Sequence, residues 1–176
     1  MKIDIARKPF VTWLIVTALA VTGMTWATYS GVAADAIAHD RFYIVTGIFA
    51  WYCVASAVAG IASLHLERDG DVTVTSDLAS SFLWFTAGNL LNLGLVGTVY
   101  GFIAMLDSSF AGKNFSDPTS IPALLPIIGE NWATALYATA SGITFNVALS
   151  VQAFAVSSAI RAQRADTLKK LAENKT

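Results

Sequence analysis

Residues 82–106 read FLWFTAGNLLNLGLVGTVYGFIAML, a run of 25 residues without a charged side chain. A helix that crosses a bilayer needs about 20 mostly apolar residues, because the hydrocarbon layer is about 30 Å thick and each residue rises about 1.5 Å. The run therefore predicts a transmembrane helix. A strand of a transmembrane β-barrel would instead alternate apolar and polar residues over only about 10 positions.

Three further apolar runs lie outside this one, at about residues 10–29, 42–66 and 132–160. Over the 176 residues, 55% are hydrophobic and only 13% are charged, whereas a soluble domain carries about 25% charged residues. We therefore expect an all-α membrane protein with four transmembrane helices, residues 1–176 forming a single membrane domain.

The basic residues predict the orientation of these helices. Nine of the 11 lie before the first run, between the second and third, or after the fourth: Lys2, Arg7, Lys8, Arg68, Arg161, Arg164, Lys169, Lys170 and Lys175. Only Arg41 and Lys113 lie in the two remaining loops. The positive-inside rule then predicts that both termini, the middle loop and the tail of residues 161–176 are cytoplasmic.

Two segments outside the runs carry further expectations. The outer loop at residues 107–131 contains Pro118, Pro122 and Pro126, which predict that no continuous helix forms there. The tail after Ile160 predicts a fourth helix that continues into the cytoplasm. Its basic face is more typical of a solvated helix end than of a surface that binds anionic lipid.

The residues that the runs lack restrict the function. No Asp, Glu, Lys, Arg or His lies deep in any run, and the nearest, His65, is close to the end of the second. An ionisable residue at the membrane centre is usually functional, so a protein of this kind that moves ions needs a carboxylate from a partner. The common catalytic motifs are also missing, so we expect no enzymatic activity, no cofactor and no metal site.

Net charge and cysteine content exclude other classes. The net charge of −1 argues against nucleic-acid binding, which needs a basic excess. The single cysteine, Cys53, excludes an intramolecular disulfide framework. Because Cys53 lies in an apolar run, we expect it to be a small buried residue.

The third run has one face of very small side chains. On a helix, Thr98 lies about 40° from Gly94 and about 60° from Gly101, so glycines flank its hydroxyl. Gly97 and Gly101 have the spacing that lets another helix backbone come close. Asn89 and Asn92 lie on other faces and are expected to form hydrogen bonds between helices.

The fourth run has a similar face. Thr139 and Asn146 are seven residues apart and lie only about 20° from alignment. Ala135 and Gly142 lie near the same stripe, which is thus suited to another helix rather than to lipid. By spacing alone, ordinary helix packing is favoured over an ion path, because a buried threonine can bond to its own helix.

The two faces carry a family resemblance. Residues 93–102, LGLVGTVYGF, resemble a helix of the MotA/TolQ/ExbB proton-channel family, and residues 135–143, ALYATASGI, are similar to its partner helix. Both motifs occur in the family's order with an outer loop between them. The first two runs match only in number, like the four-span flagellar stators.

The resemblance implies a specific assembly. Members form a ring, typically of five chains, around two copies of a single-span protein with an intramembrane aspartate. The ring is the ion-conducting part of a motor of the bacterial inner (plasma) membrane, driven by the proton-motive force. The family's pore threonines match Thr98 and Thr139, and we add Asn146 to the ion path. The residues expected to pack around the partner helix are Gly94, Gly97, Gly101, Ala135 and Gly142.

Two positions qualify this expectation. Sodium-using relatives tend to have a further threonine where this chain has Ala138, which favours protons. The middle loop at residues 67–81 is far too short for the large cytoplasmic domain of the family. Two alternatives follow from ordinary packing: a non-conducting four-helix scaffold subunit of a larger complex, or a small pore that needs no partner.

Overall fold

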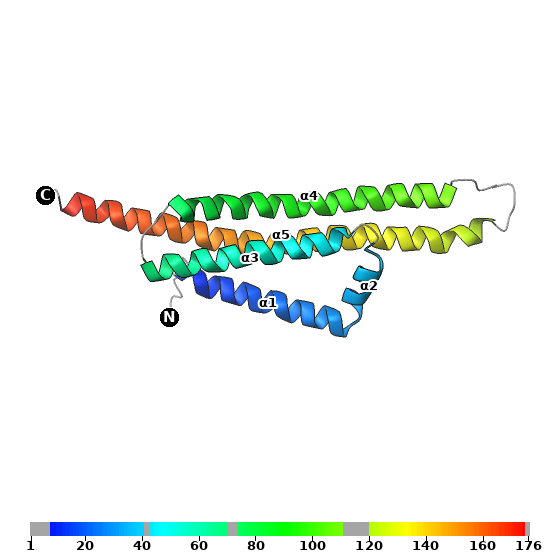
Figure 1. The fold of residues 1–176 in the computed structure, drawn as a ribbon, viewed down its shortest axis with the longest axis horizontal. Helices are drawn as coiled ribbons and strands as arrows, with labels where there is room; N and C mark the ends of the chain where they lie inside the picture. Colours follow the sequence, from blue (N-terminus) through cyan, green and yellow to red (C-terminus); the bar gives the residue numbers. More distant parts are fainter. Residues whose placement is uncertain (1–7, 41–42, 70–73, 111–119, 175–176) are drawn as a thin grey trace.

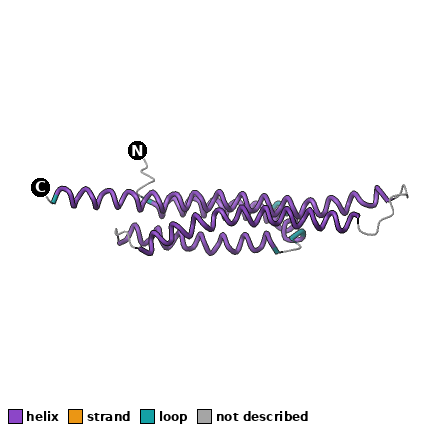
Figure 2. Tube along the Cα trace, turned by 90° about the horizontal axis from the view of Figure 1, so that it is seen from above, coloured by secondary structure: helices purple, strands orange, loops and turns teal. Residues whose placement is uncertain are grey.

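The computed structural model describes residues 8–40, 43–69, 74–110 and 120–174. These residues form a long bundle of helices without any strand among them (Figures 1 and 2). The helices are α1 (Pro9–Tyr29), α2 (Val32–Ala38), α3 (Ile44–Asp69), α4 (Val74–Phe110) and α5 (Ser120–Glu173). The helices α4 and α5 run antiparallel along most of their length, and α3 packs against both of them.

Four of these helices, α1, α3, α4 and α5, are long and apolar enough to cross a membrane. The four predicted transmembrane segments are therefore present as helices, and the chain is a multi-pass membrane protein. Two of the helices exceed the predicted segments, since α4 has 37 residues and α5 has 54. At about 1.5 Å per residue these helices are about 55 and 80 Å long.

The prediction that prolines prevent a helix before residue 132 is wrong. The helix α5 already begins at Ser120 and contains Pro126 in its interior. Pro122 lies in the first turn, where a backbone N–H has no partner within the helix in any case. Pro126 removes one further hydrogen bond from a helix of 54 residues. The third proline, Pro118, lies outside the described residues.

Both ends of the chain lie at the same end of the bundle, which we call the terminal end (Figure 1). There the Phe10 N–H donates to Glu67 Oε1 at 3.0 Å, which joins the start of α1 to the end of α3. The Gln163 side chain donates to the Leu66 carbonyl at 2.8 Å and joins α5 to α3. The last turns of α5 extend beyond the other helices at this end.

At the opposite end, Asp40 fixes the start of α3. Its carboxylate accepts hydrogen bonds from the Val45 N–H at 3.1 Å and the Thr46 N–H at 2.8 Å, and Asp40 is buried. The Thr134 hydroxyl donates to the His39 carbonyl at 2.9 Å, so the link between α2 and α3 is held against α5. Side-chain acceptors of this kind satisfy the free N–H groups of a first helical turn.

The core between α1, α3 and α5 contains a polar residue that the sequence analysis did not single out. Gln152 is fully buried, and its Nε2 donates to Ser56 Oγ at 3.1 Å and lies 3.3 Å from Thr17 Oγ1. The Trp13 indole donates to the Ser56 carbonyl at 2.7 Å. The apolar core around them includes Ile48, Tyr52, Leu66, Leu83, Leu90, Leu149 and Val156.

The outward sides of α1 and α3 are uncovered in the single chain. The hydrogen bonds that join α1 to α3 and α5 come from its first half, and its second half diverges from α3 toward α2 (Figure 1). Cys53 on α3 is exposed, so the prediction that it is buried is wrong. An apolar sequence context does not distinguish a buried side of a membrane helix from an exposed one, because a side that faces lipid is as apolar as a core.

Candidate functional site

The predicted glycine faces of α4 and α5 pack against each other. A Cβ atom added to Gly142 would lie 2.9 Å from Gly94 Cα and 2.9 Å from the Leu90 carbonyl oxygen. One added to Gly101 would lie 3.0 Å from Ala135 N. The two backbones therefore touch at these positions, which is possible only because hydrogen replaces a side chain.

This backbone contact brings the two predicted threonines together. Thr98 Oγ1 and Thr139 Oγ1 form a direct hydrogen bond between α4 and α5. Thr98 Oγ1 also lies 3.1 Å from the Gly94 carbonyl oxygen, and Thr139 Oγ1 lies 3.2 Å from that of Ala135. Each hydroxyl has one proton and two lone pairs, so the pair retains free lone pairs and can redirect a proton.

The threonine pair lies closer to the end opposite the terminal end. In α4, no charged residue occurs between Asp77 and Asp107. Thr98 is 21 residues from the first and nine from the second, or about 31 and 14 Å along the helix. Thr139 has the matching place in α5. The hydroxyls are therefore in an apolar part of the bundle, away from its middle plane.

One side of the α4–α5 pair has no other helix on it. On the opposite side, Ile44 of α3 comes within 3.1 Å of the position of a Cβ atom on Gly97. Thr98 lies about 100° round the helix from Gly97, and both threonines are half-buried. We call this uncovered side the open face; the exposed residues within one helix turn of the threonines are Leu95, Phe102, Leu136 and Ile143.

The third predicted path residue, Asn146, does not join the threonines. It is seven residues from Thr139, or about 10 Å toward the terminal end. Its Nδ2 donates to the Ala87 carbonyl at 2.6 Å and thereby ties α5 to α4. The expected bond between helices from Asn89 is absent, because its Nδ2 donates to Phe85 O in its own helix at 2.8 Å.

We expect the replacement Asn146→Leu to weaken the α4–α5 contact. Hydrogen bonds between transmembrane helices contribute about 0.6 kcal/mol on average and at most about 1.7 kcal/mol. Thermal unfolding in detergent, followed by circular dichroism, measures the loss. Asn92→Leu is the matched control, since Asn92 is an exposed asparagine of α4. Equal stability of the two variants would contradict the role of Asn146 as a tie.

The residues predicted to surround a partner helix are covered within the chain itself. Each lies in the α4–α5 contact and is buried: Gly94, Gly97, Gly101, Ala135 and Gly142. The reason is that the faces of small residues on α4 and α5 pack against each other, so the glycines of each helix contact the other helix. The side of the α4–α5 pair that no helix of this chain covers is therefore the open face, where the threonines are partly exposed.

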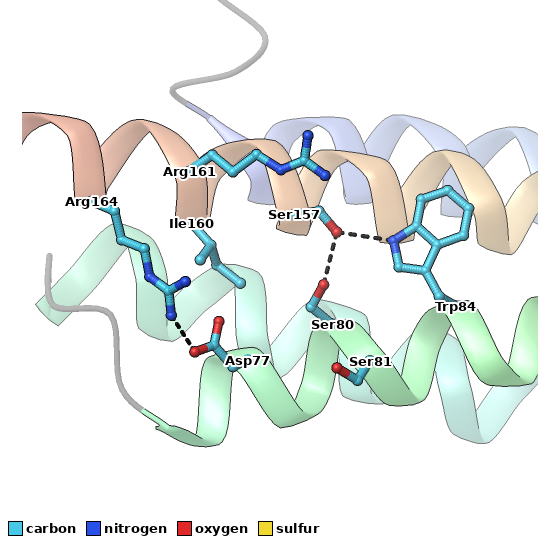
Figure 3. A pocket seen from close by; sticks show the side chains of 8 residues that line it. All are labelled: Asp77, Ser80, Ser81, Trp84, Ser157, Ile160, Arg161 and Arg164. Atoms are coloured by element: carbon cyan, nitrogen blue, oxygen red, sulfur yellow. Dashed lines mark hydrogen bonds and ion pairs between the residues drawn. The ribbon is translucent and has the colours of Figure 1, made fainter.

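A polar pocket at the terminal end was missed by the sequence analysis. Side chains from α4 and α5 line an open pocket of about 310 Å³. Figure 3 shows these side chains, which come from the beginning of α4 and the later part of α5. A signal for it exists in the sequence, because the polar residues of α5 recur at spacings of seven and four: Thr139, Asn146, Ser150, Ser157 and Arg161. Such spacings keep side chains on one helix face.

Comparison with models of protein families, with curated proteins and with solved structures finds no match. Within the residues that the structure describes, no group of three or more His, Cys, Asp or Glu side chains is placed to hold a metal ion.

Proposed function

We propose that this protein is the ring subunit of a membrane motor that conducts protons and is driven by the proton-motive force. The observation that supports this most strongly is the Thr98–Thr139 hydroxyl pair, which lies on an uncovered face within the charge-free stretches of α4 and α5. An apolar surface with two joined hydroxyls at one depth is suited to a mobile polar group from another molecule.

The hydroxyl pair fits an ionised carboxylate on a partner helix. A hydroxyl can donate to a carboxylate, or pass a proton through water, without adding a charge to the membrane. An unpaired carboxylate in an apolar site is strongly disfavoured, and protonation removes most of that cost. A carboxylate that is alternately ionised and neutral beside Thr98 and Thr139 would therefore change its contacts with the open face, which is the elementary step of the motor.

The arrangement of the helices supports a ring. We assign the terminal end to the cytoplasm, since Lys8, Arg68 and Arg161 lie there. With α1 and α3 on the outside, the open faces of several chains turn inward around two copies of a single-span partner with an intramembrane aspartate. The threonine pair then lies in the outer half of the bilayer, on the side from which protons enter.

The choice of protons over sodium has support from packing. Ala138 is only 2% exposed, and its side chain points at Gly97. A Cβ atom added to Gly97 would lie only 2.5 Å from the Ala138 Cβ atom. A larger side chain at position 138 would therefore push α4 and α5 apart. Because Na⁺, like other hard cations, is held by several oxygen ligands, a site that offers only two hydroxyls and leaves no room for a third favours protons.

The part of the chain that replaces the family's large cytoplasmic domain is the end of α5. From Arg161 to Glu173 this helix carries four basic residues, Arg161, Arg164, Lys169 and Lys170, and most of its residues are exposed. In the proposed motor, this helical end of each subunit is the surface that contacts whatever the ring drives.

Native mass spectrometry of complexes extracted gently from the source membrane tests the proposal. We expect five chains of 18.7 kDa, a mass of about 94 kDa, together with two copies of a small single-span protein. A bare ring that conducts protons after reconstitution would instead indicate a small pore that needs no partner. A monomer, a dimer or a complex with an unrelated large protein would overturn the proposal and favour a non-conducting scaffold.

A further inference from the structure

The pocket at the terminal end combines two arginines with hydroxyl groups and an indole. Its walls come from the beginning of α4 and the later part of α5; the lining residues include Asp77, Ser80, Ser81, Trp84, Ser157, Arg161 and Arg164. Figure 3 shows the two arginines extending from α5 above the α4 residues. The pocket lies about 30 Å along the bundle from the threonine pair, so it is a separate site.

The charges of this pocket leave one cation without a counterion. Arg164 forms an ion pair with Asp77, and each of the two side chains is about half exposed, at 55% and 46%. Arg161 lines the same pocket, and no ion pair or hydrogen bond holds its guanidinium among the described residues. The pocket therefore has a net charge of about +1, carried by a group that prefers the paired oxygens of a phosphate or carboxylate.

The hydroxyl groups fix the wall of the pocket and leave some donors free. Ser157 Oγ donates to the Ala153 carbonyl at 2.8 Å and accepts the Trp84 indole N–H at 3.1 Å. It also lies 2.8 Å from Ser80 Oγ, so its hydrogen-bonding capacity is used. The donors that remain for a ligand are those of Arg161, the outer N–H groups of Arg164 and the Ser81 hydroxyl.

The depth of the pocket is that of lipid headgroups. Between Glu130 and Arg161, α5 has no charged residue over about 46 Å, which matches the thickness of a bilayer with its headgroups, about 40–45 Å. Toward the membrane centre, Trp84 forms the end of the pocket, and the exposed side chain of Phe154 follows on α5. A ligand with an anionic head and an apolar tail fits a basic pocket that is followed by apolar side chains.

We propose that this pocket binds the phosphate of an anionic phospholipid in the leaflet at the terminal end. Arg161 would contact the phosphate, Arg164 would remain paired with Asp77, and the acyl chains would lie along the apolar side chains above Trp84. A free phosphate ion could make the same contacts with the arginines, but it would bind more weakly because it has no acyl chains to contact the apolar surface. The proposal concerns a single chain and does not depend on ion conduction.

A titration of purified protein with phosphatidylglycerol in a nonionic detergent, followed by native mass spectrometry, tests this site. We expect Arg161→Gln to weaken the binding of the first lipid about tenfold, the usual effect of losing a charge-assisted hydrogen bond. Lys169→Gln is the matched control, because it removes the same charge from an exposed part of α5 outside the pocket. We expect less than about a twofold effect from it.

The other arms of the experiment identify the ligand. We expect phosphatidylcholine to bind more weakly, since its choline cation faces the arginines. Inorganic phosphate at millimolar concentration should leave the lipid bound, and displacement by phosphate would assign the pocket to a free anion instead. An equal loss in both variants, or no loss in either, would overturn the proposal and leave a diffuse basic surface. Because Arg161 has no partner to lose, unchanged thermal unfolding of its variant shows that the fold is intact.

Discussion

Replacing Thr139 by valine is expected to abolish proton flux through the assembled ring without disassembling it. Valine has nearly the shape of threonine, so the close α4–α5 contact around Ala135 and Gly142 is retained. The variant removes the hydroxyl that bonds to Thr98. Only one hydroxyl then remains beside the proposed carboxylate of the partner, so a proton can no longer pass between two hydroxyls. A positioned proton-transfer group contributes at least on the order of 100-fold in rate, and we expect a loss of that size.

The measurement is proton uptake into proteoliposomes that contain the complex purified from its membrane, with a pH-sensitive dye inside. Thr25→Val is the matched control, since the Thr25 hydroxyl on α1 is exposed and donates only to the Val21 carbonyl, at 2.8 Å. Thr98→Val should resemble Thr139→Val, and the double variant should be little worse, because the two hydroxyls act as a unit. Full flux in an intact Thr139→Val ring would remove the assigned role and favour the scaffold.

The second large effect is expected from Gly142→Ala, which adds a single methyl group. This methyl would lie 2.9 Å from both Gly94 Cα and the Leu90 carbonyl oxygen, and these are backbone atoms that cannot turn aside. The helices must separate, at a cost of about 1–3 kcal/mol for an overpacked contact. Separation also lengthens the bond between Thr98 and Thr139, so flux should fall together with stability.

Thermal unfolding in detergent detects this effect against a strict control. Gly88→Ala places the same methyl on α4 at a position with no atom within 4 Å. That change should leave the unfolding temperature unchanged or raise it, because alanine favours a helix over glycine by up to about 1 kcal/mol. Equal unfolding temperatures for the two variants would contradict the close backbone contact at Gly142.

Much of the architecture could be predicted from composition and spacing. The four transmembrane helices follow from runs of apolar residues, because the bilayer requires that length and hydropathy. The glycines around Thr98 and the stripe through Thr139 also predicted helix contacts. Spacing does not say which helix covers which face, so the contact of Gly94 with Gly142 and the hydroxyl pair became visible only in three dimensions.

The errors have physical causes as well. Pro126 predicted a break in the helix, but α5 continues through it, because the loss of one backbone hydrogen bond is small beside those that remain in so long a helix. Cys53 was expected inside, but in lipid an apolar residue can lie on either side of a helix. The pocket was missed because Asp77 and Arg164 are 87 residues apart, and only the antiparallel course of α4 and α5 brings them together.

The unbroken length of α5 connects the threonine pair to the terminal end through a single helix. From the backbone contact at Gly142 the helix runs 31 residues to Glu173, or about 46 Å, and the side chains of Gln152 and Gln163 bond this part of it to α3. A tilt of α5 by about 10° about the Gly142 contact, with the helices bonded to it following, would move its end at Glu173 by about 8 Å. A small change in the packing of α4 against α5 near the threonines would thus move the far end of α5 by more than the length of one helix turn. No hinge or second domain is needed between the two places.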